Sequence, residues 1–130
     1  MIKEIIETPY APEPVGPYSQ AIKSSGTMLF ISGQIALDTK GKLVGKSIQK
    51  QTKQVIENIN AILVSQGLSL NSVVKTTVLM TDLGQFEKMN EIYAEYFADN
   101  QPCRTTVEIN SLPTPIAIEL KCIAVMPEDS

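Results

Sequence analysis

The stretch QPCRTTVEINSLPTPIAIELK, residues 101–121, contains two β-type runs with a loop between them. Side chains alternate in character over 105–109, and this period of two is typical of a strand. The second run, 116–125, is mainly apolar, and Pro113 and Pro115 mark the loop before it. The stretch therefore predicts two successive strands near the end of the chain, with no helix between them.

Arg104 and Glu119 are the charged residues of this stretch that most need an explanation. Arg104 lies at the start of the first strand, where its planar guanidinium fits either a carboxylate or phosphate ligand or a salt bridge with Glu108. Glu119 lies in an apolar run, where a buried carboxylate is costly unless it is paired or has a function. A solvent-facing position is the alternative, because Lys121 belongs to the same face of that strand. Both pairs of alternatives stay open at this point.

Two amphipathic helices are predicted before these strands. Ser47 can cap a helix over residues 48–66, and Asp82 with Gln85 resembles a capping box for a second helix over 83–98. Apolar residues recur at helical spacing in both segments. The first stripe consists of Ile48, Thr52, Val55, Ile56, Ile59, Ile62 and Leu63, and the second of Leu83, Phe86, Met89, Tyr93 and Phe97.

The remaining β-type runs are 2–6, 21–23, 28–31 and 73–80. Residues 28–31, Met-Leu-Phe-Ile, are continuously apolar, which predicts a fully buried strand. The predicted order is β-β-β-α-β-α-β-β in a single domain over residues 1–130, without a repeat or a linker. Two amphipathic helices on one face of a mixed sheet make an α+β two-layer sandwich.

Several polar residues have both a structural and a functional interpretation. Tyr18 lies in a proline-rich loop over residues 8–20, whose stiffness holds a side chain in place at low entropic cost. Ser32 and Gly33 end a predicted strand, and glycine there permits close approach of the backbone. Asn90 lies on the apolar stripe of the second helix, so its amide either braces a loop or reaches a site. Taken singly, each residue is explained by packing or bracing.

The composition excludes several kinds of chemistry. The 130 residues include no histidine, which rules out Ser-His-Asp and Cys-His catalysis. We expect no metal site, and Cys103 and Cys122 are interpreted as buried apolar residues because they form no CxxC pair.

The net charge of −3 opposes binding to nucleic acid. No run approaches the roughly 20 apolar residues of a membrane span. The first residues resemble no secretion signal, so we expect a cytoplasmic protein.

Six segments occur in the order typical of one protein family. They are Gly16-Pro17-Tyr18-Ser19-Gln20, Ile31-Ser32-Gly33-Gln34, Val74-Lys75-Thr76-Thr77-Val78, Asn90-Glu91-Ile92-Tyr93, Pro102-Cys103-Arg104-Thr105 and Ile118-Glu119-Leu120. Together they resemble the YjgF/RidA family of reactive-intermediate deaminases, in which the Pro-x-Arg segment and the terminal glutamate form the signature. The resemblance spans nearly the whole chain.

The resemblance implies a chorismate-mutase-like α+β protomer and a homotrimer with three clefts between subunits. It also implies hydrolysis of 2-imino or enamine acids, such as 2-aminoacrylate, to 2-keto acids and ammonia without a cofactor. Such intermediates leave pyridoxal-phosphate dehydratases, so a functional link to those enzymes is expected.

The same resemblance assigns roles to individual residues. The implied catalytic residues are Arg104, which grips the substrate carboxylate, Glu119, which positions and helps to activate the attacking water, and Tyr18, which lines the pocket. The implied substrate-binding residues are Ser32, Gly33, Asn90, Thr105 and Thr106.

Two other functions compete with the deaminase. RNA cleavage or inhibition of translation, attributed to some family members, would need Lys40, Lys42 and Lys46 to form a basic patch beside the cleft. A non-enzymatic binder of small carboxylates or partner proteins would use Arg104 as its anchor without needing Glu119.

Overall fold

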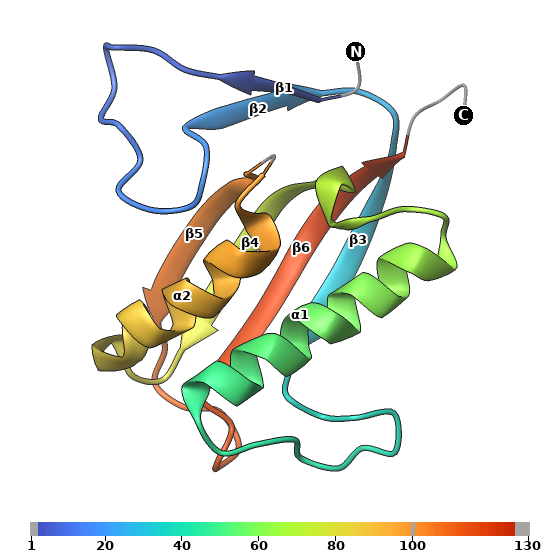
Figure 1. Ribbon diagram of the computed structural model, residues 1–130, viewed down its shortest axis with the longest axis vertical. Coiled ribbons are helices and arrows are strands. Elements are labelled where there is room, and N and C mark those ends of the chain that lie inside the picture. Colours follow the sequence, from blue (N-terminus) through green and yellow to red (C-terminus); the bar gives the residue numbers. More distant parts are fainter. Residues whose placement is uncertain (1–2, 100, 127–130) are drawn as a thin grey trace.

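The computed structural model describes residues 3–99 and 101–126. The predicted element order is confirmed (Figure 1). The strands are β1 (Lys3–Ile6), β2 (Ala21–Ser24), β3 (Thr27–Gln34), β4 (Val73–Met80), β5 (Cys103–Glu108) and β6 (Ile118–Met126), and the helices are α1 (Ile48–Ser65) and α2 (Phe86–Phe97). Short 3-10 turns at Leu70–Ser72 and Leu83–Gln85 precede β4 and α2.

The main sheet has four strands in the order β3-β6-β4-β5. β4 and β5 run parallel, whereas β6 is antiparallel to both β3 and β4, so the sheet is mixed. Strands β1 and β2 form a separate antiparallel pair. Both helices cover the same face of the main sheet, as Figure 1 shows, and the predicted α+β class is confirmed.

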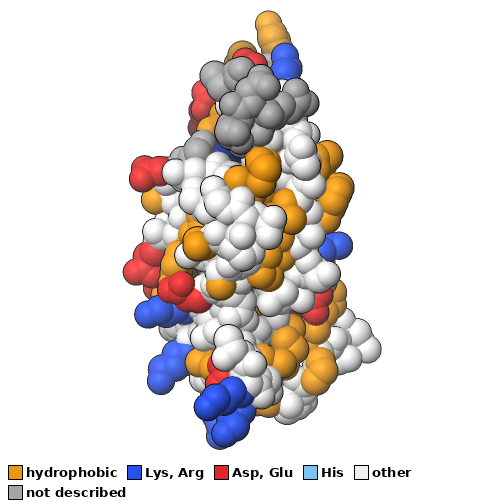
Figure 2. All heavy atoms as spheres, turned by 90° about the vertical axis from the view of Figure 1, so that its right-hand side faces the viewer, with side chains coloured by type: hydrophobic (Ala, Val, Ile, Leu, Met, Phe, Trp, Pro, Cys, Tyr) orange, Lys and Arg blue, Asp and Glu red, His pale blue; other side chains and the backbone are white. Residues whose placement is uncertain are grey.

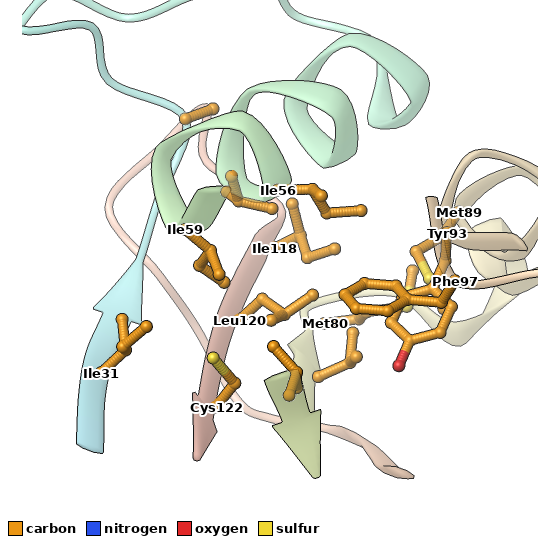
Figure 3. Close-up of a cluster of buried hydrophobic side chains, with 14 of the residues drawn as sticks. Ile31, Ile56, Ile59, Met80, Met89, Tyr93, Phe97, Ile118, Leu120 and Cys122 are labelled. Atoms are coloured by element: carbon orange, nitrogen blue, oxygen red, sulfur yellow. The ribbon is translucent and has the colours of Figure 1, made fainter. Parts of the chain in front are cut away.

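The core lies between this helix-covered face and the two helices (Figure 3). Its largest fully buried side chains include Ile56 and Ile59 of α1, Tyr93 and Phe97 of α2, and Leu120 of β6. Burying a side chain of this kind contributes about 1.5–3 kcal/mol to stability. The predicted helix stripes thus supply one half of the core, and alternate residues of β4 and β6 supply the other half.

The prediction that residues 28–31 are fully buried is wrong. Ile31 is buried, but Met28 and Phe30 are 52% and 69% exposed. β3 is an edge strand with helices on one face only, so its alternate side chains point to the open side of the sheet. That open side is called the helix-free face below.

The start of the second helix also differs from the prediction. Asp82 caps the short 3-10 turn by accepting a hydrogen bond from the Gly84 N–H at 2.8 Å, and α2 itself begins at Phe86 without a side-chain cap. Leu83, predicted to lie in the core stripe, is 41% exposed. In the described part of the chain, no helix is long and apolar enough to cross a membrane.

Candidate active site

Arg104 lies near the start of β5, beside the loop that connects β1 and β2. Its neighbour in β4 is Thr76, which is buried under α2 and shares a 2.7 Å hydrogen bond with the Tyr93 hydroxyl. The guanidinium carbon lies 4.9 Å from the ring centre of Tyr93, 5.2 Å from that of Tyr18 and 5.5 Å from that of Phe86. Three aromatic rings therefore surround one cation, an arrangement that attracts it electrostatically and restricts its motion.

Asn90 completes this group. Its Oδ1 accepts a hydrogen bond from Arg104 Nη1 at 2.6 Å. The Asn90 amide thus contacts the guanidinium of Arg104. The salt bridge between Arg104 and Glu108 does not form; Glu108 instead accepts a 2.8 Å hydrogen bond from the Leu83 N–H.

The charge of Arg104 is not neutralised within the described residues. Burial lowers the pKa of Arg104 from its ordinary value, and the neighbouring Tyr93 and Tyr18 raise it. Guanidinium nonetheless stays charged at neutral pH. Burial raises the pKa of Tyr93 to about 12, so this ring partner is a neutral phenol. A half-buried guanidinium with donors left over beyond its bond to Asn90 is suited to binding an anion.

The proline-rich loop is held by two residues that sequence reasoning did not assign to the site. Gln20 Nε2 donates to the carbonyls of Thr8, Ala11 and Pro12 at 2.9–3.2 Å, and its Oε1 accepts from the Thr8 N–H. Ser19 donates its N–H to the Pro102 carbonyl and its hydroxyl to that of Gln101. These bonds fasten the loop to the start of β5 and so hold Tyr18 against the guanidinium.

Gly16 and Gly33 leave room for side chains of the two charged residues, and neither has an unusual backbone angle. A Cβ on Gly16 would lie 3.1 Å from Arg104 Nη2. A Cβ on Gly33 would overlap the Glu119 carboxylate, which lies directly against the backbone of β3. Gly33 and Glu119 therefore form a second group, with the exposed Ser32 next to them.

The two groups lie on opposite faces of the sheet. Arg104 is paired with Thr76 and Glu119 with Leu79, three residues farther along the same strand. Residues an odd number apart on a strand face opposite sides. The offset is also about 10 Å along the strand and about 10 Å across β4. One chain therefore does not bring Arg104 and Glu119 to the same small ligand.

The two candidate threonines are divided in the same way. Thr105 is paired with Thr77, on the helix-free face, and is exposed. Thr106 is paired with Val78, on the covered face, and its hydroxyl is buried without a hydrogen-bond partner among the described residues. The structure thus collects Tyr18, Asn90 and Arg104 on one side, and Ser32, Gly33, Thr105 and Glu119 on the other.

The family model described as Endoribonuclease L-PSP matches residues 8–126. The chain belongs to the Endoribonuclease L-PSP family. A RutC family protein of Pyrococcus horikoshii is 53% identical to it over 95% of this chain and 98% of that protein. Reactive Intermediate Deaminase A of Arabidopsis thaliana is 44% identical over 95% of this chain and 66% of the plant protein.

Solved structures of the L-PSP family confirm the fold. A putative endoribonuclease from Thermotoga maritima superimposes with a TM-score of 0.73 at 44% identity, covering 95% of this chain and 97% of that one. RidA from Psychrobacter sp. PAMC 21119 gives a TM-score of 0.72 at 38% identity, covering 95% and 99%. These names confirm the resemblance to the YjgF/RidA family. They also show that members carry the names of two different activities.

Proposed function

We propose that this chain is a cofactor-independent deaminase that hydrolyses 2-imino and enamine acids to 2-keto acids and ammonia. The observation that carries the proposal is the half-buried Arg104, whose guanidinium is fixed by three rings and Asn90 but has no carboxylate partner among the described residues. The negative charge of a substrate carboxylate would pair with the positive charge of this guanidinium. The 44% identity to a reactive intermediate deaminase supports the same assignment.

The catalytic site forms between two copies of the chain, with Arg104 from one and Glu119 from the other. The placement of these residues on opposite faces supports this arrangement. The helix-free face, which carries Glu119, also exposes the large apolar side chains of Met28, Phe30 and Val107. Met28 and Phe30 are neighbours on the same face of β3, and an exposed apolar surface of this kind favours an interface; the family resemblance favours a homotrimer.

The reaction needs orientation and proton transfer rather than a strong nucleophile. Arg104 holds the substrate carboxylate bidentately and places the C=N carbon near Glu119 of the neighbouring copy. Glu119 accepts a proton from water as the water oxygen bonds to that carbon, and it then passes this proton to the substrate nitrogen, so that the C=N double bond becomes a single bond and the carboxylate is regenerated. The resulting carbinolamine transfers its hydroxyl proton to nitrogen and expels ammonia, which leaves the 2-keto acid. Imine and water are consumed in equal numbers.

The endoribonuclease alternative lacks comparable support in this chain. Lys40, Lys42 and Lys46 lie on the exposed loop between β3 and α1, at the sheet edge opposite β5 and Arg104 of the same chain; this loop follows the strand that carries Ser32 and Gly33. Figure 2 shows cationic side chains gathered at the lower end of that side of the molecule. The net charge of the protein is −3, which opposes the binding of RNA to the rest of the surface because RNA is itself a polyanion.

The direct test is keto-acid formation while a pyridoxal-phosphate serine or threonine dehydratase generates the enamine in situ. We expect this protein to accelerate release of the keto acid over spontaneous hydrolysis, in proportion to its concentration. A heat-denatured sample is the control for buffer catalysis. If a folded sample accelerates none of a panel of amino-acid-derived imines, the deaminase is excluded and the non-enzymatic carboxylate binder becomes the leading function.

A further inference from the structure

A hollow of about 290 Å³ lies on the helix-free face, over the middle of the sheet. Side chains from β3, β4 and β6 line it: Phe30, Ser32, Lys75, Thr77, Lys121 and Ile123. In the sheet register Lys121 is opposite Thr77, and Lys75 is opposite Ile123. The two lysines are therefore diagonal neighbours on adjacent strands, with Cα atoms about 7–8 Å apart.

The positive charge of this hollow is not balanced by the described residues around it. The side chains of Lys75 and Lys121 form no hydrogen bond or salt bridge with any residue in the described ranges. On the same face, the strands of the main sheet contribute one carboxylate, Glu119, and that group lies against the backbone of Gly33. Two like charges at this separation repel each other, so an anion placed between the two lysines would be stabilised.

We propose that the hollow binds a small multivalent oxyanion, with inorganic phosphate as its simplest representative. The ammonium groups of Lys75 and Lys121 supply the charge, and the hydroxyl of Thr77 supplies a further donor. The volume is at the lower limit of ligand pockets, which favours a small ion over a nucleotide or a longer chain. Phe30 and Ile123 form the apolar part of the lining.

Within one chain this anion site lies on the opposite face of the sheet from the Arg104 group, although Ser32 of its lining also belongs to the Glu119 group. Arg104 lies on the helix-covered face and is held by Tyr18, Phe86, Tyr93 and Asn90. The oxyanion site does not depend on deaminase activity, so either proposal can fail without the other.

Thermal unfolding in phosphate, compared with chloride at equal ionic strength, tests the site. We expect phosphate to raise the Tm of the wild-type protein by about 5 °C in a saturable manner. Arg104→Ala, which removes the other group suited to an anion, should still show a saturable increase. Lys40→Gln/Lys42→Gln, which removes two cations from another surface, is the matched control and should also retain it. Lys75→Gln/Lys121→Gln should lose it.

A charge reversal separates the site from a general effect of anions. Lys121→Glu places a carboxylate beside Lys75, so the variant should lose the response to phosphate and have a higher Tm in chloride than the wild type. Calorimetric titration with phosphate should show binding to the wild type and to Arg104→Ala but not to Lys121→Glu. Equal Tm values in phosphate and chloride for the wild type, or an undiminished increase in the double-glutamine variant, would overturn the proposal.

Discussion

Arg104→Ala is expected to lower kcat/KM for 2-imino acids by about 100-fold to 1,000-fold. The substitution removes the charged group that holds the substrate carboxylate and orients the C=N bond for attack. Arg104→Lys should recover little of the loss, because an ammonium cannot form the bidentate pair or lie flat among the rings of Tyr18, Phe86 and Tyr93. Initial rates of keto-acid formation over a range of enamine fluxes measure the effect.

Lys23→Ala is the matched control, because Lys23 is an exposed cation of β2 away from this group. Its activity should equal that of the wild type. The Tm of Arg104→Ala should be compared in parallel, so that lost catalysis is distinguished from lost folding. An Arg104→Ala variant that stays folded and keeps activity within a few-fold of the wild type would show that the carboxylate is held elsewhere.

Glu119→Gln is expected to lower kcat by about 100-fold to 10,000-fold while leaving carboxylate binding nearly unchanged. Glutamine keeps the shape of the side chain, so the close contact with Gly33 is preserved. It cannot accept the proton of the attacking water as a carboxylate does. Calorimetric titration with a 2-keto acid product, together with the rate assay, separates the loss of chemistry from the loss of binding.

Glu4→Gln, on the exposed surface of β1, is the control for a change of one charge and should be fully active. The outcome distinguishes the deaminase from a carboxylate binder that uses Arg104 alone. If the protein is only a binder, Glu119→Gln and Glu4→Gln should bind the keto acid equally well, and neither the variants nor the wild type should catalyse deamination. Full activity of Glu119→Gln would remove this carboxylate from the mechanism.

The fold was largely predictable because its elements are strongly periodic. The stripes of α1 and α2 and the β-type runs identify each element and most of the core. The predicted burial of Met28 and Phe30 is wrong. A continuous apolar run does not show whether both faces of the strand are covered by the same chain or only one. The position of Leu83 was missed because Asp82 caps a 3-10 turn before α2 begins.

The sequence names the residues of the candidate site, which remain a prediction, but it does not give their arrangement. Tyr18 and Asn90 both contact Arg104 in the structure. The separation of Arg104 from Glu119 depends on how β4 is aligned with β5 and β6, and this alignment cannot be deduced from the sequence of any one strand.

Gln51 illustrates the same limit. It is fully buried and bonds the Pro115 carbonyl and the Ala117 N–H, although its amide gives no such indication in the sequence.

The central claim is that one catalytic site combines Arg104 of one copy with Glu119 of another. Mixing the two inactive variants tests it: Arg104→Ala and Glu119→Gln are unfolded together, refolded in equal amounts and assayed for keto-acid formation. Random assembly should leave an intact Arg104–Glu119 pair at about a quarter of the sites and restore about a quarter of wild-type activity. Each variant refolded alone is the control. A mixed sample with no more activity than the separate variants, in assemblies shown to contain both chains, would contradict the shared site.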